Sequence, residues 1–179
     1  MFILKKKYFL IIESIKDLDL KNIKKHNNFN IIYRNKKKGE NIADLIIFRK
    51  SCKLKSIKFF VANDAKLSVL LNSDGIYLSA FNKSLKTLSL RKSNFEIIGS
   101  AHNVKEISTK IKQGCNLILF SKLFLVNYDK KSPFMGIIKF NNLLKFNKKL
   151  IPLGGINENN LNSLNIINSS GLALMSEIK

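Results

Sequence analysis

The chain has little cysteine and proline and no tryptophan: its 179 residues include 2 cysteines and 2 prolines. Cys52 and Cys115 stand far apart, with no Cys-x-x-Cys pair and no cluster of histidines. This spacing implies neither a disulfide framework nor a zinc site, and we expect two buried thiols. Because no proline-rich or glycine-rich linker divides the chain, we predict one domain over residues 1–179.

Long apolar runs are also missing. No run reaches the roughly 18 residues that a membrane-spanning helix needs. The first seven residues place apolar side chains before the lysines, which is the reverse of a secretory signal. We therefore expect a cytoplasmic protein with no membrane partner.

Acidic side chains are few, since 12 Asp and Glu stand against 32 Lys and Arg, for a net charge of +20. Clustered cations would indicate nucleic-acid binding, because they neutralise phosphates and release counterions. Here the lysines are spread through nearly every segment and accompany many Asn and Ile residues, as AT-rich coding tends to produce. We interpret much of the charge as compositional bias on solvated faces and keep nucleic-acid binding as a third hypothesis.

Short β-branched or aromatic runs alternate with longer amphipathic runs, the pattern of repeated β-α units around a parallel sheet. The short runs predict eight strands, at 8–13, 29–34, 58–62, 75–78, 95–100, 116–121, 150–153 and 172–175. The longer runs predict helices at 14–26, 42–54, 64–71, 104–113, 135–146 and 160–167, and one helical turn within 82–94. The pattern indicates an α/β fold, a compact (β/α)8 TIM barrel, whose C-terminal helix we expect to be missing because the chain ends soon after the eighth strand.

Cations follow two of the predicted strands, on the barrel face where binding residues gather. The second strand ends in Arg34 and Lys36, which we expect to clamp an anion. The loop after the sixth strand carries Lys130 and Lys131. This face therefore has the charge to bind phosphorylated small molecules.

Polar groups follow the third and fifth strands at the same face. Asn63 and Asp64 place a carboxylate beside a carboxamide, which predicts oxygen ligands for Mg²⁺. The same two residue types also cap helices, so a purely structural role stays open. Ser100 and His102 supply a hydroxyl and an imidazole, and His102 is a candidate general acid or base.

Small residues follow the last two strands. Gly154 and Gly155 let the backbone approach a ligand and present N–H groups to an anion, and Ser176 follows the eighth strand. Because phosphate frequently binds after strands seven and eight of such barrels, we expect a phosphate site here.

The order of these motifs resembles the family of thiamine phosphate synthase and its relative the thiazole tautomerase. The family patterns Gln-x-Arg-x-Lys, Asn-Asp and Gly-x-Ser-x-His, the last shortened by one residue, are similar to residues 32–36, 63–64 and 99–102. The family segments Asp-Gly-Val-His-Leu-Gly-Gln-x-Asp, Gly-Gly-Ile and Val-Ser-x-Ile are similar to residues 74–82, 154–156 and 175–178.

The resemblance implies that a hydroxymethylpyrimidine diphosphate is joined to a thiazole phosphate, with magnesium-assisted loss of pyrophosphate. Asp64 would bind magnesium, and Gly155 with Ser176 would hold the thiazole phosphate. By matching position, the diphosphate ligands would be Arg34, Lys36, Asn63, Ser100 and one of Lys130 or Lys131.

Several positions differ from the family pattern. Ile32 replaces a glutamine, Tyr77 a histidine and Asn82 a second metal carboxylate, which should weaken magnesium binding. The alternative hypothesis is therefore a thiazole tautomerase using His102 as proton carrier, or a protein that only binds thiazole phosphate. The barrel face left open by the missing helix also keeps a homo-oligomer among the hypotheses.

Overall fold

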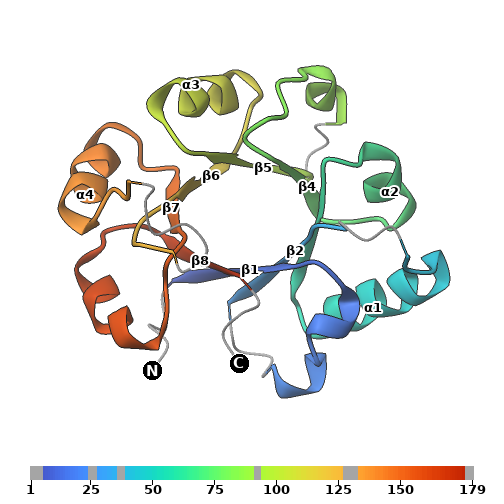
Figure 1. Cartoon of the computed structure of the whole chain (residues 1–179). Helices are drawn as coiled ribbons and strands as arrows, with labels where there is room; N and C mark the ends of the chain where they lie inside the picture. Colours follow the sequence, from blue (N-terminus) through green and yellow to red (C-terminus); the bar gives the residue numbers. More distant parts are fainter. Residues whose placement is uncertain (1–5, 24–27, 36–38, 91–93, 127–132, 176–179) are drawn as a thin grey trace.

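The computed structural model describes residues 6–23, 28–35, 39–90, 94–126 and 133–175 (Figure 1). Eight parallel strands form one sheet in the order β7-β6-β5-β4-β3-β2-β1-β8. The strands are β1 (Lys7–Ile12), β2 (Phe29–Tyr33), β3 (Lys58–Ala62), β4 (Gly75–Leu78), β5 (Glu96–Ala101), β6 (Leu117–Ser121), β7 (Leu150–Leu153) and β8 (Gly171–Met175). The ends of the sheet also approach each other, since β7 lies against β8. The predicted TIM barrel is confirmed as a nearly closed ring.

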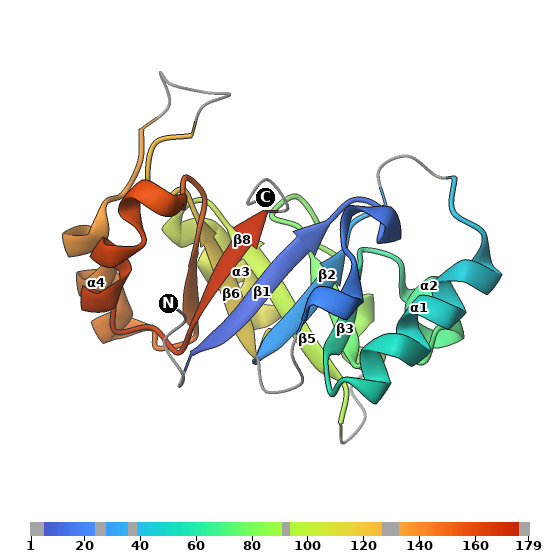
Figure 2. The same cartoon turned by 90° about the horizontal axis from the view of Figure 1, so that it is seen from below.

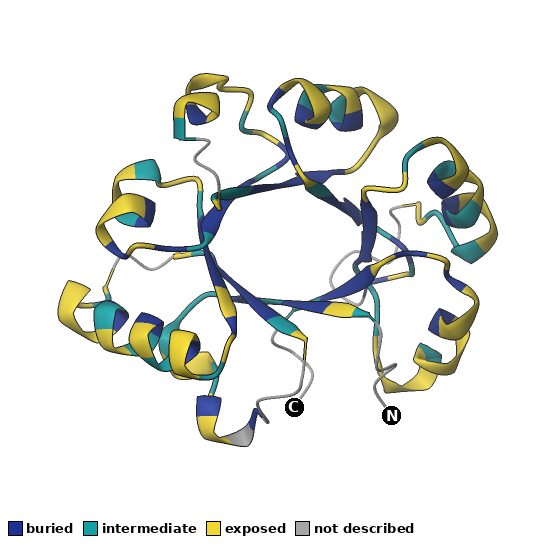
Figure 3. Cartoon of the chain, turned by 180° about the vertical axis from the view of Figure 1, so that it is seen from behind, coloured by how far each residue is buried: buried dark blue, intermediate teal, exposed yellow. Residues whose placement is uncertain are grey.

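The strands are buried on both faces because side chains alternate between the barrel interior and the surrounding helices. One hydrophobic cluster takes its members from all eight strands and fills the barrel; it includes Phe9, Ile32, Phe60, Ile98 and Leu119. Figure 3 shows the result as a dark ring of buried strands inside helices with exposed outer faces. Figure 2 shows β1 and β8 side by side, in agreement with their parallel pairing.

Four α-helices pack outside the ring: α1 (Ile42–Leu54), α2 (Ala65–Leu70), α3 (Val104–Lys112) and α4 (Ile137–Phe146). Polar caps begin three of them, because the side chains of Asn41, Asp64 and Asn103 each accept a backbone N–H of the first turn. The helix α4 follows Gly136, whose φ is +73°. Of the helices in the described part of the chain, none is long and apolar enough to cross a bilayer.

Two predicted helices are wrong. Residues 14–26 contain the short 3-10 helices η1 (Ile15–Asp17) and η2 (Leu20–Asn22), and residues 160–167 contain the end of η4 (Glu158–Asn160) and η5 (Asn162–Ile166). In the first segment, Ser14 and Asp19 each start a new turn, and in the second, asparagine side chains bond the local backbone. Such side chains compete with a continuous helix. The single turn expected within 82–94 is η3 (Lys86–Leu90).

The prediction of a missing C-terminal helix concerns the chain after β8, where residues 176–179 lie outside the described ranges.

Candidate functional site

The mouth of the barrel, at the carboxyl ends of the strands, contains an ion pair. Because Ile11 and Ile32 point into the barrel, Glu13 and Arg34, two residues further along, point to the same side. The Arg34 Nη2 lies 2.9 Å from Glu13 Oε1. The backbone N–H of Arg34 donates to the Ile12 carbonyl at 2.8 Å, and this bond fixes the end of β2 against β1. Arg34 therefore sits at the mouth, where the sequence placed it.

Arg34 also has one donor that is shielded from solvent and unpaired. Its Nε is buried and makes no hydrogen bond to any described residue. An unpaired buried donor costs about 1–3 kcal/mol, a cost that a bound anion would remove. Glu13 was missed by sequence reasoning, although its alternation with Ile11 could have placed it beside Arg34.

Tyr77 belongs to the cluster that fills the barrel, and its pKa responds to both Arg34 and Ser100. Burial raises the pKa of the Tyr77 phenol, while a hydrogen bond with Ser100 and the charge of Arg34 act in the opposite direction. Tyr77 is therefore a neutral phenol at physiological pH. Ser100 is itself buried and follows Ile98, which points into the barrel. Arg34, Tyr77 and Ser100 form what we call the mouth cluster; Tyr77 was recognised in the sequence only as a departure from the family.

Asn63 forms a second polar corner with the loop after β4. Its φ of +57° lies in the left-handed region, which asparagine tolerates better than most residues. The Asn63 Oδ1 accepts hydrogen bonds from the Ser79 N–H at 3.0 Å and the Asn82 Nδ2 at 3.1 Å. The corner thus joins the ends of β3 and β4. The role of Asn63 in diphosphate binding stays a prediction.

The carboxylate of Asp64 caps α2, since its Oδ1 accepts the Leu67 N–H at 2.9 Å. The neighbouring Asn82 supplies an amide in place of a carboxylate. No group of three or more His, Cys, Asp and Glu side chains in the described ranges could hold a metal ion. One exposed carboxylate, already engaged as a cap, does not fit a magnesium site made by the protein alone.

We expect Asp64→Ala to destabilise the fold by about 1 kcal/mol, because the first turn of α2 loses its cap. Asp64→Asn should preserve most of this stability, since asparagine is an equally good cap. Urea unfolding of both variants would measure the difference. Equal losses in the two variants would contradict the capping role.

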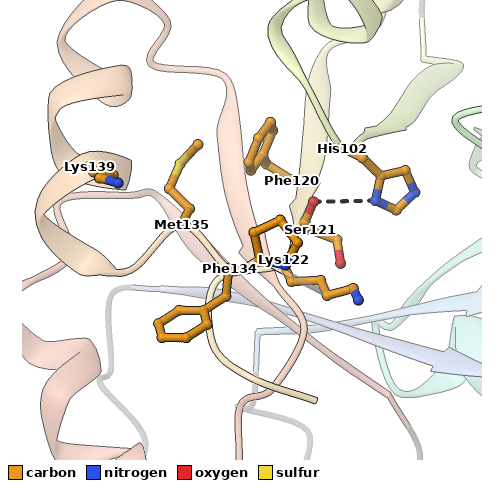
Figure 4. Close-up of a pocket in the computed structure, with 8 residues that line it drawn as sticks. His102, Phe120, Ser121, Lys122, Phe134, Met135 and Lys139 are labelled. Carbon is orange, nitrogen blue, oxygen red and sulfur yellow. Dashed lines mark hydrogen bonds between the residues drawn. The ribbon is translucent and has the colours of Figure 1, made fainter. Parts of the chain in front are cut away.

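His102 follows the last residue of β5. Its Nδ1 is 3.2 Å from the Ser121 carbonyl oxygen, and its backbone N–H donates to Glu106 at 2.7 Å. The ring is exposed and borders a pocket of about 540 Å³. Figure 4 shows this pocket between the ends of β5 and β6 and the start of α4. The described lining residues are His102, Phe120, Ser121, Lys122, Pro133, Phe134, Met135 and Lys139.

This lining includes neither Arg34 nor Ser100. Arg34 and Ser100 both lie at the carboxyl ends of strands, and His102 follows Ser100 at the end of β5 with its ring in this pocket. A catalytic role of His102 stays a prediction.

Gly154 and Gly155 form a turn against the segment that follows β6. Their φ angles are +91° and +70°. The Gly154 carbonyl accepts the Phe124 N–H at 3.1 Å, and the Gly155 carbonyl accepts the Asn160 Nδ2 at 2.7 Å. The two glycines thus form a tight turn, whereas phosphate binding by it stays a prediction. Four predicted site residues lie outside the described ranges: Lys36, Lys130, Lys131 and Ser176.

Comparisons with known proteins agree on one family. The family "Thiamine monophosphate synthase" matches residues 20–178. A thiamine-phosphate synthase of Prochlorococcus marinus is 27% identical over 152 residues, which cover 83% of this chain and 44% of the relative. A thiamine-phosphate synthase of Methanococcus maripaludis is 26% identical over 121 residues, covering 67% of this chain and 58% of the relative. The chain thus spans less than half of the first relative and under two thirds of the second.

Solved structures support the fold. A thiamine phosphate pyrophosphorylase from Pyrococcus furiosus superimposes with a TM-score of 0.74 at 16% identity, covering 96% of this chain and 86% of that chain. A citrate synthase superimposes with a TM-score of 0.64 at 11% identity, with the same coverage. One barrel therefore accompanies different chemistries, as is common. The comparisons favour neither the tautomerase nor the nucleic-acid hypothesis.

Proposed function

Because this chain belongs to the thiamine monophosphate synthase family, we propose that it joins hydroxymethylpyrimidine diphosphate to a thiazole phosphate and releases pyrophosphate. The observation that carries the proposal is the mouth cluster. It places a guanidinium, a phenol and a hydroxyl where two phosphorylated reactants would enter the barrel.

The reaction breaks the bond between the pyrimidine methylene carbon and the diphosphate oxygen. Pyrophosphate leaves with the bonding electrons, and the thiazole nitrogen supplies the lone pair for the new C–N bond. Arg34 would stabilise the charge that develops on the leaving oxygens, since its buried Nε needs an acceptor. Ser100 and Tyr77 would orient the diphosphate, because a fixed geometry lowers the entropic cost of reaction.

Glu13 competes with the diphosphate for Arg34. A diphosphate carries more negative charge than one carboxylate and can accept both the Nε and Nη2 donors, so it should displace Glu13. When pyrophosphate departs, Glu13 can return to Arg34. This exchange would favour product release.

The remaining assignments belong to the same proposal. Asn63 contacts the diphosphate, together with Lys36 and one of Lys130 or Lys131, while the Gly154-Gly155 turn and Ser176 receive the thiazole phosphate. A domain spanning residues 1–179, which we place in the cytoplasm, would act on these small molecules. The family uses magnesium, but Asp64, already engaged as the cap of α2, is the one carboxylate of the predicted metal site and does not by itself fit an ion held by the described residues.

A direct assay tests the proposal. The purified chain would be incubated with both phosphorylated substrates, with magnesium in one series and a chelator in the other, and thiamine phosphate would be measured by mass spectrometry. We expect product and pyrophosphate in equal amounts in the magnesium series. Absence of product in both series, from protein that is folded by circular dichroism, would refute the proposal.

A further inference from the structure

Lys110 is a fully buried lysine on α3, with 0% of its surface exposed. Its Nζ donates three hydrogen bonds: to the Ser79 carbonyl at 2.7 Å, the Asn82 carbonyl at 2.7 Å and the Gln113 Oε1 at 2.8 Å. An ammonium has three donors, so all are used. All three acceptors are neutral oxygens.

Gln113 completes the arrangement. It is also fully buried, and its Nε2 donates to the carbonyls of Asn82 at 3.0 Å and Ser84 at 2.8 Å. Two side chains of one helix therefore hold the loop after β4, residues 79–84, by four hydrogen bonds to its backbone. We call this pair the loop clamp.

The sheet makes room for the stem of Lys110 at Gly99. A Cβ on Gly99 would lie 2.7 Å from Lys110 Cδ and 2.8 Å from Cys115 Sγ. The ammonium thus passes from the helix layer, over β5, to the loop at the barrel mouth. The same space could hold an apolar side chain, which would avoid the cost of removing a charge from water. An apolar side chain could not make the three hydrogen bonds that Lys110 donates, so the charged group is explained by what it holds.

The loop clamp holds the same loop that supplies the two hydrogen bonds to Asn63. Ser79 and Asn82 both donate to Asn63 Oδ1, and Ser84 N–H donates to Asn82 Oδ1 at 2.9 Å. A continuous chain of hydrogen bonds therefore connects Lys110 in the helix layer to Asn63 at the end of β3.

We propose that Lys110 is a positioning residue: with Gln113 it fixes residues 79–84 so that Asn82 and Asn63 meet the pyrimidine diphosphate at the mouth. The link to the diphosphate rests on the proposed function, whereas the holding of the loop does not.

The test compares Lys110→Met with Lys112→Met, an exposed lysine on the same helix. Methionine keeps the apolar stem, and the two released backbone carbonyls keep a donor, since Gln113 bonds the Asn82 oxygen and the Asn82 N–H bonds the Ser79 oxygen. The Gln113 Oε1 loses the Lys110 donor, which costs stability. Lys110→Met should still fold. Hydrogen–deuterium exchange of residues 79–84 should accelerate about tenfold in Lys110→Met and stay unchanged in Lys112→Met, because hydrogen bonds to a charged group are lost.

The kinetic readout separates positioning from general damage. We expect the KM for the pyrimidine diphosphate to rise about tenfold in Lys110→Met, with the KM for the thiazole phosphate unchanged. Gln113→Met should shift both readouts in the same direction, and it replaces Lys110→Met if that variant does not fold. The proposal would be overturned if Lys110→Met and Lys112→Met gave the same exchange rate for residues 79–84 and the same KM for the pyrimidine diphosphate.

Failure of the proposed function would look different. If the unmodified chain makes no thiamine phosphate, the exchange measurement still decides whether Lys110 holds the loop. Calorimetry with inorganic pyrophosphate then replaces the KM, and a Kd for pyrophosphate that is unaffected by Lys110→Met would overturn the positioning role.

Discussion

Replacing Arg34 with alanine should lower kcat/KM for the pyrimidine diphosphate by about 100-fold to 1,000-fold, the usual effect of removing a preorganised donor to developing negative charge. Arg34 is the cation that the structure places in the mouth cluster, beside Tyr77 and Ser100. Steady-state kinetics with each substrate varied in turn would measure the change. The KM for the thiazole phosphate should change little, because the Gly154-Gly155 turn is proposed to receive that phosphate.

Two further variants identify the cause of the loss. Arg34→Ala removes the guanidinium that lies 2.9 Å from the carboxylate of Glu13, and the negative charge of Glu13 would itself repel a diphosphate. Adding Glu13→Gln to Arg34→Ala removes the repulsion, so any loss that remains belongs to the guanidinium. Arg34→Lys should be intermediate, since lysine keeps the charge but not the two-pronged donor geometry. A kcat/KM for Arg34→Ala within twofold of the unmodified chain would contradict the role of Arg34.

The barrel could be predicted because each strand carries a strong local signal. Residues 58–62, 75–78 and 150–153 were predicted with the bounds that the structure shows, and so was the helix Ile42–Leu54. The three strands are largely buried on both faces, so they read as short apolar or β-branched runs. The segments 14–26 and 160–167 lack such a signal, because polar side chains there bond the nearby backbone.

The site could be predicted in part, since its residues follow predicted strands. The position of Arg34 and Ser100 at one mouth follows from alternation along β2 and β5. The surroundings of Tyr77 and Lys110 depend on pairings between segments about 20 to 45 residues apart, which no local pattern contains. The role of Asp64 could not be decided from the sequence, because a carboxylate suits both a helix cap and a metal ligand. The structure shows it as the cap of α2.

Gly155→Ala is expected to destabilise the chain by about 3 kcal/mol or more, through two separate costs. The first is conformational: the φ of +70° costs an alanine roughly 1–2 kcal/mol. The second is steric, because the new Cβ would lie 2.5 Å from the carbonyl oxygens of both Phe124 and Leu125. These are backbone atoms, so the segment after β6 would have to move.

Gly136→Ala is a control in which the close contact is absent. Its φ of +73° and ψ of 164° lie in a region almost restricted to glycine, but a Cβ there would meet nothing within 4 Å, so only a conformational cost of about 1–3 kcal/mol applies. Thermal unfolding of the two variants separates the costs, since 1 kcal/mol shifts the Tm of a chain of this size by about 2–4 °C. We expect the Tm of Gly155→Ala to fall below that of Gly136→Ala by several degrees. Equal Tm values would show that the close approach of the Gly154-Gly155 turn to Phe124 and Leu125 does not constrain residue 155, and that only its left-handed conformation does.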